Sequence, residues 1–450
     1  MRLLPPDEDI KAMLEELGYS SLEEFMESVL SGFRLSSYEV DLDTLDEMEL
    51  LDEIRGLELK NKVFRGDRIF ISTGVEPSWV SPVVRNIISR GEFLTSYTPY
   101  QSEMSQGVLQ ALYEYQSIMA ELLNMDVVNS SMYDGASAAA EALLLGERVA
   151  RKKRVLIPSN MYRNWRSVIH TYLYGSSIEV KTYPPLSIDE DLSLNVIEDE
   201  LRKGVSAVLI EFPDSYGYIT ERVYELADLV HSYGAILVSH VDLWSIFTVL
   251  APGDYSSDVA VAEGQPLGLD MGFGGPLLGV FAVSNEFRLI RNMPGRLIGE
   301  TITNNGEKAY TMVLQTREQH IRRGDATSNI CTNEALSAIQ ILVNLVVLGK
   351  KFFIKRSYEM IKYAHRLKDS LRSLGINTVS TLPFTRRFTI DFSDIDGYDI
   401  YHRLISEGYL PGYLWDKNRL TININALHNS TSIINYSASM EEAINDVQTS

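Results

Sequence analysis

Residues 207–239 read AVLIEFPDSYGYITERVYELADLVHSYGAILVS, and this stretch decides the fold. Two short β-rich runs, Ala207–Glu211 and Ala235–Ser239, flank the segment Thr220–Tyr233, whose apolar residues recur at helical spacing. A strand, a helix and a second strand in this order predict a βαβ unit with parallel strands. Both strands are almost entirely apolar, as expected of a sheet that helices cover on both faces.

The alternation of strand and helix continues on both sides of this unit. Further strands are expected at Arg154–Ile157, Ser177–Tyr183, Val259–Ala262 and Leu278–Val283. Further helices are expected at Ala136–Ala150, Asn164–Tyr174 and Ile188–Lys203. Strands that alternate with helices in this way predict an α/β domain with a mostly parallel sheet.

The N-terminal end of the chain has a different character. Residues 1–62 predict a helical extension, with acidic helices at Asp7–Leu17, at Ser21–Leu30 and within Asp41–Leu59. Glu24 follows Ser21 by three residues, which is the capping-box pattern at the start of a helix. So short and charged a segment has little core of its own, so we expect it to pack on the body of the protein or on a partner.

The C-terminal third predicts a smaller α+β domain. A long helical pattern runs from about Thr332 to Leu374 and is interrupted near Gly349. Short strands are expected after it at Phe388–Phe392 and Leu420–Asn425, and helices at Tyr398–Glu407 and Met440–Val447. The predicted domains are therefore 1–62, 63–330 and 331–450.

The composition excludes several classes of function. Lys and Arg number 41 and Asp and Glu 61, so the formal net charge is −20, and so acidic a chain has no electrostatic basis for binding nucleic acid or an anionic membrane surface. The single cysteine, Cys331, excludes a disulfide within the chain and is expected to be a small buried hydrophobe. The Cys and His spacing predicts no metal site. The N-terminus does not read as a signal peptide, and apolar stretches such as Ile339–Leu348 are too short to span a bilayer, so the expected compartment is the cytoplasm.

A large α/β domain followed by a smaller α+β domain is the layout of the aspartate-aminotransferase-like enzymes that use pyridoxal phosphate (PLP), fold type I. Such an enzyme needs a helix N-terminus for the phosphate, a carboxylate for the pyridine nitrogen and a lysine for the Schiff base. Residues Tyr133–Ser137 precede the small-residue helix and offer backbone N–H groups and the Ser137 hydroxyl; a plain N-cap is the alternative. Asp242 follows the predicted strand Ala235–Ser239, at the end of a strand where ligands bind in open α/β sheets; a solvated or helix-capping aspartate is the alternative.

The lysine is missing. In this fold it would lie some tens of residues after Asp242, yet no lysine occurs between Lys203 and Lys308, and residues 263–276 read EGQPLGLDMGFGGP. Arginine cannot replace it, because the guanidinium stays protonated and is no nucleophile. If the fold is of this type, the chain cannot hold PLP as a Schiff base.

Several strings of sequence resemble one family closely, in order and at sensible spacing over roughly residues 60–350. The strings are residues 92–107 (EFLTSYTPYQSEMSQG), 132–141 (MYDGASAAAE), 263–268 (EGQPLG), 273–276 (FGGP), 293–300 (MPGRLIGE), 315–323 (QTREQHIRR) and 326–333 (ATSNICTN). They are similar to glycine dehydrogenase (decarboxylating) subunit 1, the alpha chain of the two-chain P-protein of the glycine cleavage system. The resemblance explains the missing lysine, because in that family PLP is attached to a separate second subunit.

The resemblance also implies the reaction and the partners. An enzyme active only as a complex with PLP-bearing glycine dehydrogenase subunit 2, a heterotetramer, would decarboxylate glycine and pass the aminomethyl group to the lipoyl arm of the H-protein. No residue of this chain is expected to bind a cofactor or a metal. The protein would orient the scissile bond, exclude water and admit the lipoyl arm.

The site residues expected from the resemblance lie in Thr95–Gln101. Tyr97, Tyr100 and Gln101 form a stiff turn around Pro99 and would reach the partner subunit's active site, where their hydroxyls and carboxamide could bind the glycine carboxylate. The alternative is a structural turn with packed tyrosines.

A second cluster concentrates positive charge in residues 315–323. Arg317, His320, Arg322 and Arg323 could bind a carboxylate or brace a subunit interface, and an interdomain polar network is the alternative. The glycines Gly272, Gly274 and Gly275 are expected to serve tight turns.

Two other functions remain open beside that of a half-site contributor. The chain could be a non-catalytic scaffold or H-protein docking subunit of the same complex, or a self-sufficient PLP enzyme. The lysine gap argues against the last.

Overall fold

The computed structural model of the 450-residue chain describes residues 5–33, 44–330, 334–393 and 395–449. The chain divides into two units, Met1–Val63 and Phe64–Ser450. Cys331 lies outside the described residues, and so does the start of the predicted domain 331–450. The division of the larger unit near residue 330 therefore stays a prediction.

The described residues of the first unit form three helices, α1 (Asp7–Glu16), α2 (Leu22–Val29) and α3 (Glu47–Glu58). The start of α2 departs from the predicted capping box: the Ser21 hydroxyl accepts from the Glu24 N–H, but the Glu24 carboxylate accepts from Ser20. A full capping box forms instead at α3, between Asp46 and Glu49. None of the residues of these helices is buried.

The second unit is built on a seven-stranded sheet in the order β1-β7-β6-β5-β4-β2-β3. The strands are β1 (Val127–Val128), β2 (Arg154–Pro158), β3 (Glu179–Tyr183), β4 (Ala207–Phe212), β5 (Ile236–Val241), β6 (Val259–Glu263) and β7 (Gly279–Val283). Strands β2 to β6 are parallel, and β7 runs antiparallel to both of its neighbours, β6 and β1. The six predicted strands are confirmed. Strand β7 is antiparallel to β6 because residues 264–278 form no crossover helix that would return the chain to the same end.

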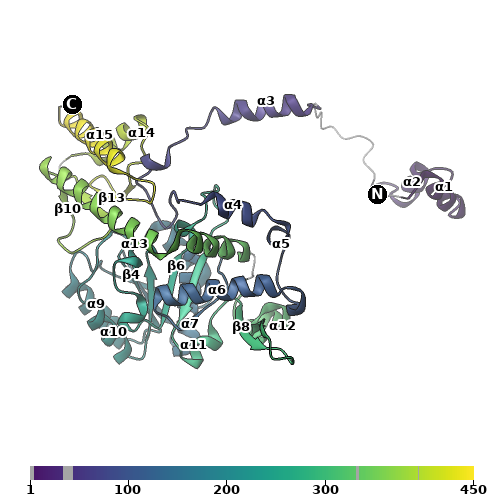
Figure 1. Cartoon of the computed structure of the whole chain (residues 1–450), viewed down its shortest axis with the longest axis horizontal. Coiled ribbons are helices and arrows are strands. Elements are labelled where there is room, and N and C mark those ends of the chain that lie inside the picture. The colour runs from purple at the N-terminus through teal and green to yellow at the C-terminus, as the bar shows by residue number, and fades with distance from the viewer. Residues whose placement is uncertain (1–4, 34–43, 331–333, 394, 450) are drawn as a thin grey trace. The chain divides into compact units, whose positions relative to one another are not determined.

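Helices cover both faces of this sheet, as the apolar strands predicted (Figure 1). Alternate residues of β4 belong to different cores: Ala207 and Leu209 pack with α7 (Gly135–Ala150) and α8 (Arg163–Leu173), and Val208 and Ile210 with α9 (Glu190–Arg202) and α10 (Val223–Ser232). Helix α7 lies close to the sheet: a Cβ at Gly146 would come within 2.6 Å of the Ala207 Cβ. The four predicted helices are confirmed within about three residues at each end.

One layer was not predicted from the sequence. Helix α6 (Gln106–Leu123) packs against a hairpin of β8 (Leu297–Ile302) and β9 (Lys308–Val313). The Gln116 amide bonds the N–H and C=O of Ile298, and the Gln106 amide bonds those of Tyr310. The short helices α4 (Pro82–Ile88), α5 (Gly91–Leu94), α11 (Phe287–Asn292) and α12 (Gln319–Arg322) complete this part.

The C-terminal part contains the predicted long helix and a small antiparallel sheet. Helix α13 (Ala335–Ser373) bends at Gly349, whose φ is 74°. The sheet has the order β10-β11-β13-β12, from Asn377–Thr378, Arg387–Asp391, Arg419–Asn423 and Tyr413–Leu414 respectively. This part also contains the helices α14 (Gly397–Ser406) and α15 (Ser430–Thr449). Helix α15 begins ten residues before Met440, where the sequence predicted the start of the last helix.

One expectation about apolar stretches needs correction. Of the described helices, α13 alone is long and apolar enough to cross a membrane by length and composition. The apolar stretch Ile339–Leu348, which was expected to be too short and too interrupted by polar residues, is the N-terminal part of this longer helix. Core residues account for much of the apolar character, since Ile339, Ile341 and Leu342 are buried in the main hydrophobic cluster.

Candidate functional site

The three places where a fold type I enzyme would hold its cofactor lie together at one edge of the large sheet. Asp242 follows β5, Glu263 ends β6, and Gly135 begins α7. A cavity of only ≈ 20 Å³ lies at this edge, lined in part by Asp242 and Glu263. Side chains therefore fill the edge where a ligand would bind in an open α/β sheet.

The N-terminus of α7 is already occupied by a carboxyl group of this chain. The Glu263 carboxylate accepts hydrogen bonds from the backbone N–H groups of Gly135 at 2.9 Å, Gln265 at 2.9 Å and Leu278 at 3.2 Å. Burial raises the pKa of Glu263 to about 8, although the three N–H groups favour the ionised form. Ser137 forms a capping box with Asp134. Of the two alternatives for Tyr133–Ser137, a phosphate site or a plain N-cap, the structure has the plain N-cap.

Aromatic rings close the space beside this helix. The Trp165 indole lies on the His240 imidazole with ring centroids 4.0 Å apart, and its N–H donates to the Thr73 carbonyl at 2.6 Å. A Cβ at Gly135 would lie 2.4 Å from the indole, which shows how closely the ring approaches the first turn of α7. His240 is held in turn by Glu211, at 2.9 Å.

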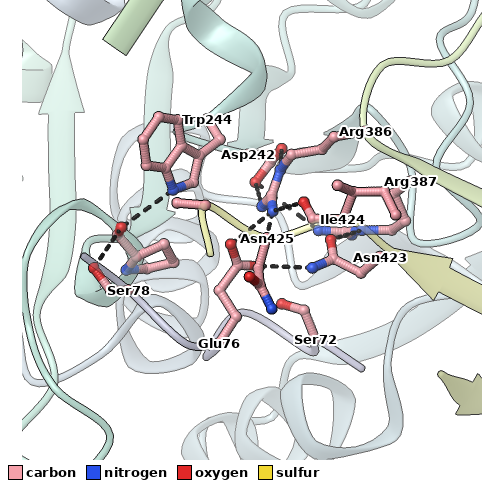
Figure 2. A network of polar contacts seen from close by, with 12 residues as sticks. Ser72, Glu76, Ser78, Asp242, Trp244, Arg386, Arg387, Asn423, Ile424 and Asn425 are labelled. Carbon is pink, nitrogen blue, oxygen red and sulfur yellow. Dashed lines mark hydrogen bonds and ion pairs between the residues drawn. The ribbon is translucent and has the colours of Figure 1, made fainter. Parts of the chain in front are cut away.

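Asp242 belongs to a buried ion cluster with residues from distant parts of the chain. Figure 2 shows Arg386 between two carboxylates: its Nη1 donates to Glu76 at 2.7 and 2.8 Å, its Nε donates to Asp242 at 2.7 Å, and its Nη2 also bonds Asp242. Asn423 donates to Glu76 at 2.9 Å, and Arg387 lies 3.9 Å from Asp242. Two carboxylates and two guanidinium groups balance in charge, as a buried cluster requires.

The electrostatics of Asp242 follow from this cluster. Burial by itself would raise the pKa of Asp242, but the guanidinium groups of Arg386 and Arg387 hold it well below its usual range. The carboxylate is thus permanently ionised and already paired. Neither the helix-capping nor the solvated alternative describes it.

The residues at this edge do not fit PLP. The position for a phosphate is occupied by the Glu263 carboxylate, and the carboxylate that would meet a pyridinium is paired with Arg386. No lysine is available between Lys203 and Lys308. A cavity of ≈ 20 Å³ has room for about one water molecule and none for PLP.

The tyrosine turn, residues 95–101, lies elsewhere, between α5 and α6. Tyr97 is 61% exposed and Tyr100 48% exposed, and the Gln101 side chain is also exposed. The turn is held from below by Arg296, which is 3% exposed and donates to the Thr98 Oγ1 at 2.7 Å and to the Tyr100 hydroxyl at 2.9 Å. A hydroxyl that accepts from a guanidinium keeps its own proton for another acceptor.

Residues 315–323 support Arg296 from the other side. Arg317 is buried and donates to the carbonyls of Met293 and Gly295, so it holds the loop that carries Arg296. The Glu318 carboxylate lies 3.6 Å from the Arg296 Nε. Burial raises the pKa of Glu318, and Arg317 and Arg296 oppose this. Three of the strings that carry the resemblance, 92–107, 293–300 and 315–323, thus meet in one place.

The predicted positive cluster is divided by the fold. His320 lies edge-on to the Tyr100 ring, with centroids 5.2 Å apart, and burial together with Arg296 lowers the pKa of His320. Arg317 is buried in the polar network described above, whereas Arg322 and Arg323 are exposed. The cluster is therefore part structural network and part free surface.

The glycines form the tight turn that was expected. Gly275 donates to the Gly272 carbonyl at 3.4 Å, and Gly274 has a φ of 110°. A Cβ at Gly272 would lie 2.4 Å from the Gly275 oxygen, so this closure requires a glycine.

The sequence patterns did not predict several residues of these two places. Arg296 and Glu263 lie inside strings that carry the resemblance. Each is a charged residue next to apolar ones, and such a pattern indicates a charge that needs a partner if the fold buries it. Arg386 comes from a segment 144 residues after Asp242. No local pattern could connect them.

Comparisons with known proteins agree with the resemblance. The model of the glycine cleavage system P-protein family matches residues 1–435. The chain is 44% identical over 417 residues to a probable glycine dehydrogenase (decarboxylating) subunit 1 of Staphylothermus marinus, covering 90% of this chain and 88% of that relative. It is 42% identical to the protein of the same name from Aeropyrum pernix, covering 89% and 88%.

Solved structures agree on the fold. A crystal structure of glycine decarboxylase (P-protein) of the glycine cleavage system, in inhibitor-bound form, matches with a TM-score of 0.84 and 33% identity, covering 98% of this chain and 100% of that chain. A glutamate decarboxylase of Lactobacillus brevis matches at a TM-score of 0.69 and 14% identity, covering 93% and 96%. The fold is thus that of the PLP-dependent enzymes of fold type I, as predicted.

Proposed function

The chain belongs to the glycine cleavage system P-protein family, and from this premise we propose that it is the subunit without PLP, which completes the active site of a second, PLP-bearing subunit. Its relatives are named glycine dehydrogenase (decarboxylating) subunit 1, so the reaction is the decarboxylation of glycine. The aminomethyl group that remains passes to the lipoyl arm of the H-protein. PLP, held by the partner, stabilises the negative charge that decarboxylation leaves.

The filled cofactor position is the observation that carries this proposal. Glu263 lies on the α7 N-terminus and Arg386 on Asp242, so this chain has no room for PLP of its own. A P-protein chain with no cofactor site can take part in the reaction only through a partner. The chain therefore acts on glycine by what its surface presents to the second subunit.

The tyrosine turn is the part of the surface best suited to this role. Arg296 holds Thr98 and Tyr100 from below, so both the ring and the hydroxyl of Tyr100 have a defined position. Because the hydroxyl accepts from a cation, its own proton can be donated outward to the carboxylate of glycine. Tyr97 and Gln101 supply a further hydroxyl and a carboxamide beside it. These groups would orient the substrate carboxylate, which must leave as carbon dioxide.

Tyr97→Phe and Tyr100→Phe test the proposal in the assembled complex with the second subunit, PLP and H-protein. A hydrogen bond to a charged group contributes roughly 1.5–3 kcal/mol, and about 1.4 kcal/mol is tenfold in rate. We expect kcat/KM for glycine to fall roughly tenfold to a hundredfold in each variant. The ring remains in place, so association with the second subunit, measured by analytical ultracentrifugation, should survive.

Tyr174→Phe is the matched control, because this tyrosine is 89% exposed and lies beyond the end of α8. Its kcat/KM should equal that of the unchanged complex. Full specific activity in both Tyr97→Phe and Tyr100→Phe would reject the half-site proposal and leave the scaffold function. Weaker assembly with normal turnover per intact complex would show a purely structural turn.

A further inference from the structure

A groove rich in arginine lies next to the polar network that supports the tyrosine turn. It has a volume of ≈ 300 Å³ and is bordered by α11, by residues 314–317 and by α12 and the residues after it. We call it the arginine groove. Its lining residues are Phe287, Arg288, Arg291, Asn292, Leu314, Thr316, Arg317, Arg322 and Thr327.

The charge of this groove is opposite to that of the whole chain. Four arginines line it, and none of the described residues that line it is an Asp or Glu, although the formal net charge of the chain is −20. Within the described part of the chain, Arg291 and Arg322 form no ion pair, whereas Arg288 pairs with Glu286 at 2.6 Å and Arg317 lies 3.9 Å from Glu318. The groove therefore offers exposed cations in a field that is otherwise negative.

The groove also has apolar contact area. Phe287 is 69% exposed and Leu314 40% exposed. The Arg291 guanidinium lies 5.4 Å from the centre of the Phe287 ring, which holds the cation at the rim rather than free in solvent. A ligand for such a surface combines carboxylates with at least one apolar side chain.

Arg317 connects the groove with the tyrosine turn. Its side chain lines the groove and donates to Met293 and Gly295, directly before Arg296, which holds Tyr100. A molecule seated in the groove would thus dock one loop away from the hydroxyls proposed to meet glycine.

We propose that the arginine groove docks an acidic surface segment of the protein that carries the lipoyl arm. The proposal rests on the proposed function, because it supposes that the arm must reach the site that the tyrosine turn completes. Cations in the groove would orient the carrier, since long-range attraction of opposite charges raises the rate of encounter and selects one orientation.

The chemistry of the groove favours the carrier over the second subunit. Cores of lasting interfaces are poor in charge and rich in apolar side chains, and Leu94 and Met104, at 59% and 82% exposed, offer such contacts on both sides of the tyrosine turn. A carrier must leave after every turnover, and a salt-dependent contact through exposed arginines suits brief binding.

Charge reversal tests the groove in the assembled complex with its second subunit and PLP. For Arg291→Glu, Arg322→Glu and the double variant we expect KM for the lipoylated carrier to rise roughly tenfold or more, with little change in kcat at saturation. The ratio of activity with the carrier to activity with free lipoamide, which has no protein surface, should fall by a similar factor. The dependence of kcat/KM for the carrier on ionic strength should become weaker.

Arg366→Glu is the charge-matched control, because Arg366 is exposed on the C-terminal half of α13 and forms no ion pair within the described residues. It should leave KM for the carrier unchanged. An equal rise in Arg366→Glu would show a general charge effect and overturn the proposal.

Other outcomes separate this inference from the proposed function. Unchanged KM for the carrier in the double variant, in a complex that decarboxylates glycine, overturns the docking site alone. Loss of the second subunit from the variants, seen by analytical ultracentrifugation, would place that subunit in the groove and overturn the carrier as its occupant. A rise in KM for glycine instead would show a small-anion site and overturn the carrier as the occupant of the groove. Absence of activity in the unchanged complex would reject the proposed function itself.

Discussion

Glu263 shows how a side chain can occupy a helix N-terminus of the kind that binds a phosphate. Its carboxylate lies on the α7 N-terminus, where backbone N–H groups and the helix dipole favour a negative charge. Burial acts in the opposite direction and raises the pKa to about 8. In the unfolded chain the pKa of a Glu is about 4.3. At any pH between about 4.3 and about 8, the folded protein therefore binds more protons at Glu263 than the unfolded chain does.

The pH dependence of stability follows from this excess of bound protons. The contribution of Glu263 is fully present below about pH 4 and is lost as the pH rises toward about 8. We therefore expect the free energy of unfolding of the unchanged chain, minus that of Glu263→Gln, to decrease by a few kcal/mol between about pH 5 and 8. Urea unfolding at several pH values measures this difference, in which the other titrating groups cancel. A difference that is flat or rises with pH would show that the N–H groups keep Glu263 ionised throughout.

The tyrosine turn shows what residue-level reasoning could and could not find. Two hydroxyls around Pro99 were visible in the sequence as a stiff turn. Their support was not visible, since Arg296 lies 196 residues after Tyr100 and only the fold brings the two together. The signal that was missed is an arginine in an otherwise apolar loop, residues 293–298, because such a cation must be paired when buried.

Among the elements, α13 was predicted well and the β8–β9 hairpin was not. The helical pattern and its interruption at Gly349 were both visible, and the structure has the bend at that residue. The hairpin follows a signal that was overlooked: Asn305-Gly306 lies between the two strands, and Gly306 has a φ of 82°. Asn-Gly between short β-rich runs is a strong sequence sign of a hairpin.

The bend in α13 gives a prediction at this scale. Gly349 has φ 74° and ψ 158°, a conformation that residues with a Cβ rarely adopt, while nothing lies within 4 Å of a Cβ built there. Gly349→Ala should therefore lower the free energy of unfolding by about 1–3 kcal/mol through backbone strain alone. Thermal or urea unfolding of the variant measures the cost.

Gly107→Ala serves as the matched control in α6. This glycine is also open to solvent on its Cβ side but has ordinary helical geometry, so alanine should raise the stability by roughly 0.4–1 kcal/mol. Opposite signs in the two variants are the expected result. A neutral or stabilising Gly349→Ala would mean that α13 can straighten without loss, and the bend would then not be required by the fold.

At the scale of the whole molecule, the ion cluster joins segments that are far apart in the chain. Glu76, Asp242 and Arg386 come from three regions and are all buried or nearly so. Removing one partner from such a cluster leaves an uncompensated buried charge. The cluster therefore keeps Asp242 paired and fills the edge of the large sheet at which a fold type I enzyme binds its cofactor.

This closure predicts the behaviour of the isolated chain with PLP. Purified alone and mixed with PLP, the chain should show no absorbance of a bound Schiff base at neutral pH. Borohydride reduction followed by peptide mapping should find no pyridoxyl-lysine, and the chain alone should release no carbon dioxide from glycine. A specific pyridoxyl-lysine at a single position, or turnover by the single chain, would contradict the filled cofactor position and restore the self-sufficient enzyme.

The sequence by itself determined the class of the fold, the place of most strands and helices in the large sheet, and the absence of a lysine for PLP. Periodicity and capping are local properties, so they can be read along the chain. The tertiary structure alone decided that Glu263 takes the place of a phosphate, that Arg386 neutralises Asp242, and that Arg296 and Arg317 support the tyrosine turn. These pairs depend on which distant segments pack against each other, because a buried charge is stabilised by whatever partner the fold brings near, at any separation in sequence.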